Sequence, residues 1–232
     1  MKKFKFLIII LLSFNFFGQN LQVSNEILKE IENKKLEFEG QERSFKIRLP
    51  ENYDPKKSYP VFLGLSGGNQ TEAIVDYCYA AWFRNDVFRN HLLVMPVGAG
   101  HESMAKQNDA EWDLMMNMLR KHYKTKKKGW ILSGTSNGGI AAFHLLKRFP
   151  RTFSKVYVTP GYLDQPTEAL PPKWKRISFY LRYGDQDDPQ WKKSMKETAD
   201  LLRKRSKHVI LEEIKGQGHI LNLEYDQNEL YR

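Results

Sequence analysis

The chain has 232 residues, 41% of them hydrophobic and 13% aromatic, which is enough for one domain with a sizeable core. The formal net charge is +10, but the basic residues are scattered or lie in short runs at expected helix ends, which argues against nucleic-acid binding. The single cysteine, Cys78, excludes an internal disulfide.

The N-terminal residues have the pattern of a signal peptide. Lysines within residues 1–5 precede an apolar run from Phe6 to Leu12, which Ser13 interrupts before it reaches the ~20 residues that a membrane-spanning helix needs. Removing residues 1–19 takes away three lysines and leaves a net charge of +7 (10 minus 3). We therefore predict a periplasmic or secreted protein that is not stably inserted in a membrane, with residues 20–232 as a single domain.

The remaining sequence alternates between strand and helix patterns. An opening antiparallel hairpin is predicted from Leu36 to Leu49, where apolar residues alternate on one face. Short apolar runs predict buried parallel strands at 60–65, 92–97, 130–132 and 156–158, and two further strands are expected at 177–183 and 209–214. Helices are predicted at 71–88, 109–122, 139–149 and 190–205. The order predicts an α/β fold, with helices on both faces of a mostly parallel sheet and little or no lid.

Residues 134–138 match the motif G-x-S-x-G, and they lie between a predicted strand and a predicted helix. Such a tight turn holds its serine in a strained conformation, and small residues are needed two positions before and after it, as Gly134 and Gly138 are here. Ser136 is therefore the candidate nucleophile. The following helix points free N–H groups at the site, so the Asn137 N–H is the expected oxyanion donor.

A serine nucleophile needs a histidine base. His219 follows the last predicted strand in a glycine-rich loop, downstream of Ser136, and is the candidate base. His101 follows the strand at 92–97, so we expect it as a substrate contact. His122, His144 and His208 are interpreted as structural or solvent-exposed, and His91 as a loop residue.

The carboxylate that orients the histidine is expected after the strand at 177–183, where the loop offers Asp185, Asp187 and Asp188. Asp188 precedes Pro189 and suits the N-cap of the next helix. Asp187 and Asp185 both remain candidates for the acid.

Two further groups of residues suggest substrate contacts. The glycines after the strand at 60–65 let the backbone approach an oxygen closely, so Gly68 is the expected second oxyanion donor, with Gly67 in reserve. Trp82, Trp112 and Trp191 could offer stacking surfaces or pack in the core; Trp112 is kept as a candidate substrate contact.

The residues from Phe38 to His219 together resemble the α/β-hydrolase superfamily, and within it the compact esterase branch of feruloyl esterase and polyhydroxybutyrate depolymerase-like proteins. The matching segments are residues 48–54, residues 59–63 leading to Ser66-Gly67-Gly68, and the turn at Ser136-Asn137-Gly138-Gly139. The resemblance implies the α/β-hydrolase fold and assigns Asp187 as the acid, because it lies three residues after Gly184. One difference stands out, since these proteins usually carry histidine where this chain has Ser66.

The sequence thus predicts an exported serine hydrolase that cleaves carboxylic esters through a Ser136–His219–Asp187 triad and an acyl-enzyme. No metal or organic cofactor is expected. The candidate substrates are acyl or feruloyl esters on carbohydrate. The alternatives are a peptidase of the same fold and a non-catalytic protein that binds glycan or polymer.

Overall fold

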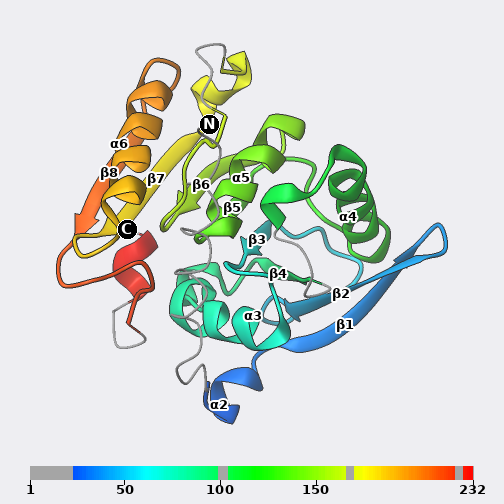
Figure 1. The fold of residues 1–232 in the computed structure, drawn as a ribbon. Helices are drawn as coiled ribbons and strands as arrows, with labels where there is room; N and C mark the ends of the chain where they lie inside the picture. The colour runs from blue at the N-terminus through cyan, green and yellow to red at the C-terminus, as the bar shows by residue number, and fades with distance from the viewer. Residues whose placement is uncertain (1–22, 99–103, 166–169, 223–226, 232) are drawn as a thin grey trace, which may run out of the picture.

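The computed structural model describes residues 23–98, 104–165, 170–222 and 227–231. These ranges contain one sheet of eight strands in the order β1-β2-β4-β3-β5-β6-β7-β8 (Figure 1). The strands are β1 (Glu32–Phe38), β2 (Gln41–Arg48), β3 (Val61–Leu65), β4 (Leu92–Val97), β5 (Trp130–Gly134), β6 (Phe153–Val158), β7 (Ser178–Gly184) and β8 (Val209–Ile214). β2 pairs antiparallel with β1 and β4, and all other pairs are parallel. The predicted hairpin and mostly parallel sheet are confirmed.

Helices cover both faces of the sheet, as predicted. They are α2 (Asn25–Leu28), α3 (Glu72–Cys78), α4 (Asp109–His122), α5 (Asn137–Arg148) and α6 (Pro189–Arg203), with short helical turns η2 (Tyr79–Phe83), η3 (Asp86–Phe88), η4 (Met104–Lys106), η5 (Pro172–Arg176) and η6 (Gln227–Tyr231). Val61 and Leu63 of β3 lie in a core built with α4, α5 and α6. Phe62, between them, lies in a second core built with α3, η2 and η6. This alternation follows from the two-residue repeat of a strand.

The single helix predicted at 71–88 is wrong. α3 ends at Cys78, continues as the π-helical turn η2, and breaks at Arg84, whose backbone is extended. The Arg84 guanidinium is paired with Glu30 at 2.6 Å, and the Asn85 side chain accepts a hydrogen bond from the Val87 N–H at 2.8 Å to cap η3. Helical spacing of the apolar residues persists across this break, so their periodicity did not reveal it.

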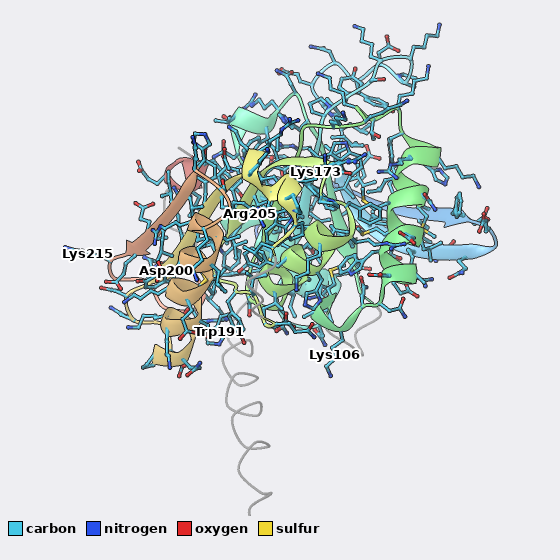
Figure 2. All side chains as sticks on the ribbon, turned by 90° about the horizontal axis from the view of Figure 1, so that it is seen from above. Lys106, Lys173, Trp191, Asp200, Arg205 and Lys215 are labelled. Atoms are coloured by element: carbon cyan, nitrogen blue, oxygen red, sulfur yellow. The ribbon has the colours of Figure 1, made fainter. Side chains whose placement is uncertain are left out.

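The carboxyl ends of the parallel strands define the edge where the site residues gather. Trp191, at the start of α6 after β7, and Lys106, in η4 after β4, lie along the same margin of the molecule in Figure 2.

Within the ranges described, no helix is long and apolar enough to cross a membrane. Residues 1–19, the predicted signal peptide, lie outside the described residues.

Candidate active site

Ser136 lies in a two-residue turn between β5 and α5. Its backbone is at φ 53° and ψ −123°, a left-handed φ that is unfavourable for a residue with a Cβ. The turn is held in this conformation from both sides. The Ser136 N–H donates to the Pro160 carbonyl at 2.7 Å, and the Thr135 N–H donates to the Leu65 carbonyl at 3.1 Å.

Glycines on either side of Ser136 are required by close backbone contacts. A Cβ on Gly134 would lie 2.3 Å from the Gly138 carbonyl oxygen, and one on Gly138 would lie 2.0 Å from the Leu65 carbonyl oxygen. A Cβ on Gly139 would lie 2.3 Å from the Pro160 carbonyl oxygen. The sequence motif indicated the first two positions, and the structure adds the third.

The structure brings Ser136, His219 and Asp187 together in one hydrogen-bonded chain. His219 Nδ1 lies 2.9 Å from Asp187 Oδ1, and His219 Nε2 lies 2.9 Å from Ser136 Oγ. An ionised carboxylate can only accept hydrogen bonds, so the Nδ1–H donates to Asp187. In the neutral imidazole Nε2 then accepts from the Ser136 hydroxyl, which is the arrangement that a general base requires.

The three carboxylates of the loop after β7 have three different partners. Asp187 Oδ1 accepts from His219 and from the Asp188 N–H at 2.7 Å. Asp188 Oδ1 accepts from the Gln190 N–H at 2.8 Å and caps α6. Asp185 Oδ1 accepts from the Gly216 N–H at 2.8 Å, which ties this loop to the one that carries His219. Of the two candidates for the acid, only Asp187 contacts the imidazole.

The acid and the base of the site differ in solvent exposure. The Asp187 side chain is 0% exposed, whereas the His219 side chain is 28% exposed. Asp187 Oδ2 is buried and has no hydrogen-bond partner in the part of the chain that is described. A buried carboxylate with few donors around it favours a positive charge on its neighbour, so this arrangement stabilises the imidazolium that forms when His219 takes a proton.

The two N–H groups predicted as oxyanion donors, those of Asn137 and Gly68, belong to neighbouring segments. The Asn137 side chain donates from Nδ2 to the Gly68 carbonyl at 3.2 Å, so the loop after β3 adjoins the start of α5. No acceptor for the Asn137 or Gly68 N–H is found among the described residues. The reserve candidate, Gly67, is disfavoured. The Gly67 backbone is instead hydrogen-bonded to the Cys78 sulfur. Burial raises the pKa of the Cys78 thiol to about 12, and this hydrogen bond opposes part of the rise.

The remaining predicted substrate contacts have different outcomes. His101 lies outside the described residues. Trp112 is only 1% exposed and packs in the core, so the expectation that it offers a stacking surface is corrected. It borders a hollow of about 530 Å³ that Lys106, His144 and Lys147 also line and that no triad residue lines. Trp82 is likewise buried.

Trp191 is the tryptophan that reaches the site. Its ring centroid lies 4.5 Å from that of His219, and the Tyr162 ring packs against it with centroids 4.9 Å apart. Sequence reasoning named Trp191 as one of three equivalent tryptophans and missed Tyr162. The position of Tyr162 four residues after the end of β6, at the active edge of the sheet, is the signal that could have identified it.

Comparisons with known proteins identify a family for the chain. Residues 37–211 match the model of a family described as "Putative esterase". The search of curated proteins found no relative that matches the sequence.

Solved structures provide further matches. A thermostable esterase aligns with TM-score 0.66 and 14% identity over 82% of this chain, which spans only 56% of that protein. A ferulic acid esterase from Anaeromyces mucronatus, solved with ferulic acid, aligns with TM-score 0.58 and 17% identity over 83% of this chain and 85% of that one. The feruloyl esterase module from Clostridium thermocellum, complexed with sinapinate, aligns with TM-score 0.62 and 13% identity over 90% of each chain. At these identities the structural matches establish the α/β-hydrolase fold.

Proposed function

The chain belongs to this esterase family and is a carboxylic ester hydrolase, and we propose that it works as an exported serine esterase through Ser136, His219 and Asp187. The observation that carries the proposal is the hydrogen-bonded chain from Ser136 Oγ through the His219 imidazole to Asp187, with both distances at 2.9 Å.

The acylation step follows from this geometry. Ser136 Oγ attacks the ester carbonyl carbon while its proton passes to His219 Nε2. The negative charge that develops on the carbonyl oxygen is stabilised by the N–H groups of Asn137 and Gly68. Asp187 stabilises the imidazolium, which then gives the same proton to the leaving alkoxide and releases the alcohol.

Deacylation repeats the sequence with water. His219 takes a proton from a water molecule, whose oxygen attacks the acyl carbon, and the Ser136 oxygen leaves and recovers its proton from the imidazolium. The acid product departs and the enzyme returns to its starting state. Each proton transfer uses His219 Nε2, which the contact with Asp187 keeps oriented toward Ser136.

For the substrate we propose an ester of an aromatic acid, carried on carbohydrate. Trp191 packs against His219, and Tyr162 packs against Trp191, so the two rings supply an aromatic surface that begins next to the reacting atoms. Two structurally similar proteins are a ferulic acid esterase solved with ferulic acid and a feruloyl esterase module complexed with sinapinate. Export, which the lysine-rich and apolar pattern of residues 1–19 favours, would bring the enzyme to polysaccharide outside the cell.

The test is hydrolysis of p-nitrophenyl acetate, p-nitrophenyl butyrate and methyl ferulate by residues 20–232 and by the variants Ser136→Ala and His219→Ala. We expect turnover of all three esters, a higher kcat/KM for methyl ferulate than for the butyrate, and a loss of at least ~10³-fold in both variants. The exposed histidine His208 provides the matched control, because His208→Ala should leave kcat within about twofold.

Other results would support other functions. Cleavage of peptide substrates in preference to esters would favour a peptidase. Folded protein that hydrolyses nothing and does not react with a fluorophosphonate probe would favour a non-catalytic binding protein. Turnover that survives Ser136→Ala would overturn the mechanism.

A further inference from the structure

The loop between β3 and α3 carries one of the two proposed oxyanion donors, and it contains a buried glutamine with no role in the triad. Gln70 is 0% exposed, and its φ of 54° is left-handed, a conformation that is costly for a residue other than glycine. Burying a polar side chain and holding its backbone in a strained conformation both cost free energy, so other interactions must compensate for them.

The Gln70 side chain makes that set of interactions with the loop itself. Its Nε2 lies within hydrogen-bond distance of three successive carbonyl oxygens, those of Ser66 at 2.9 Å, Gly67 at 3.1 Å and Gly68 at 2.9 Å. Two amide hydrogens are therefore shared among three acceptors. Gln70 Nε2 thus lies at the centre of the loop, and its three acceptors converge on it.

The convergence of the carbonyls sets the direction of the N–H groups. In a trans peptide the N–H points opposite to the carbonyl of the same peptide unit. Because the Gly67 carbonyl points at Gln70, the Gly68 N–H of that unit points away from Gln70. The Gly68 carbonyl also accepts from Asn137 Nδ2 at 3.2 Å, so this loop adjoins the residue that carries the other proposed donor.

Gln70 is itself fixed from the neighbouring strand and the following turn. Its Oε1 accepts from the Met104 N–H at 3.1 Å, and its backbone carbonyl accepts from the Gly98 N–H at 2.8 Å. A Cβ on Gly98 would lie 2.8 Å from the Asn69 carbonyl oxygen and 3.1 Å from Gln70 Cβ, so the close approach depends on glycine at that position. The glutamine is therefore a rigid link between the end of β4, η4 and the loop.

We infer that Gln70 is a positioning residue that holds the Gly68 N–H in the orientation of an oxyanion donor. The inference rests on the proposed serine esterase function and adds to it a residue that does not touch the substrate.

The test compares Gln70→Glu and Gln70→Met with the unmodified enzyme on p-nitrophenyl acetate. Glutamate keeps the shape but replaces the amide donor with an oxygen facing three carbonyls, and methionine keeps the volume without a donor. Loss of one oxyanion donor lowers kcat about 10²- to 10³-fold, so we expect that loss with KM within about threefold. The pH dependence of kcat/KM should keep its midpoint, because His219 and Asp187 are untouched.

Two measures separate positioning from a general loss of structure. Rates are normalised to the folded fraction at the assay temperature, so a partly unfolded variant still reports on the site. Asn85→Asp is the matched control, since Asn85 is only 3% exposed and caps η3 through an oxygen that aspartate retains. It should leave kcat within about twofold even if it lowers the melting temperature.

The outcomes are distinguishable. A normalised kcat within threefold of the unmodified enzyme in both Gln70 variants, or a raised KM with unchanged kcat, would overturn the positioning role while leaving the serine esterase function intact. An unmodified enzyme without Ser136-dependent turnover would overturn the proposed function and this inference with it.

Discussion

The Trp191 indole and the His219 imidazole pack edge to face, with ring centroids 4.5 Å apart and ring planes at 71°. Trp191 is the third residue of α6. This helix is capped by Asp188 and begins directly after the loop that carries Asp187. One short segment therefore supplies the carboxylate that orients His219 and the ring that packs against it. Such edge-to-face contacts contribute about 0.5–1.5 kcal/mol beyond burial alone.

Replacing Trp191 with alanine should lower kcat/KM for methyl ferulate about 3- to 10-fold more than for p-nitrophenyl acetate, because an aromatic acid loses its stacking partner. Trp191→Phe is the control and should retain most of the preference. Equal losses for both esters would show that Trp191 supports His219 and not the substrate.

Asp187→Asn should lower kcat by about 10⁴-fold, because the amide cannot stabilise the imidazolium and can impose the wrong tautomer on His219. Asp185→Asn is the matched change in the same loop. Its amide oxygen can still accept from the Gly216 N–H, so kcat should stay within a few fold. Steady-state kinetics on p-nitrophenyl butyrate measure both variants, and a larger loss in Asp185→Asn would reassign the acid.

Gly138→Ala should destabilise the turn around Ser136, since the added Cβ would lie 2.0 Å from the Leu65 carbonyl oxygen and neither backbone segment can move without disturbing β3 or α5. We expect a loss of at least about 1–3 kcal/mol in the free energy of unfolding, measured in urea, together with most of the activity. Gly218→Ala meets no atom within 4 Å and should leave the unfolding midpoint unchanged. Similar midpoints for the two variants would contradict the steric account.

The fold should lose stability below neutral pH through His91. Burial lowers the pKa of this imidazole from 6.5 to about 4, with smaller contributions from the positive charges of Arg48 and Lys126. Between these values the unfolded chain binds a proton that the folded chain does not, so the free energy of unfolding falls as pH drops from about 6.5 to 4.

The His91 contribution is at most about 3 kcal/mol, and less because the ring is partly solvated. His91→Gln, which carries no titrating group, should flatten the dependence of the urea midpoint on pH over that interval. An unchanged slope would assign the acid sensitivity to other groups.

The sequence by itself determined the parts of this protein that depend on local pattern. Strand and helix order, the antiparallel start and the turn at Ser136 all follow from residues close together in the chain, where apolar spacing and glycine positions encode conformation directly. Periodicity failed at Arg84, where the backbone becomes extended and the side chain pairs with Glu30, 54 residues away in sequence.

Tertiary structure decided the remaining questions, because each is settled by distances between segments that sequence spacing does not constrain. Asp185 and Asp187 are two residues apart, yet only the packing of the β7 and β8 loops brings Asp187 to His219, which in turn bonds Ser136 across 83 residues. Trp112 and Trp191 are the same residue type, and both lie on amphipathic helices. The position of each helix decides that Trp112 is buried in the core and that Trp191 lies beside the His219 imidazole. The contacts that tie Gln70 to the end of β4 and to η4, from the Gly98 and Met104 N–H groups, likewise join segments 28 and 34 residues apart.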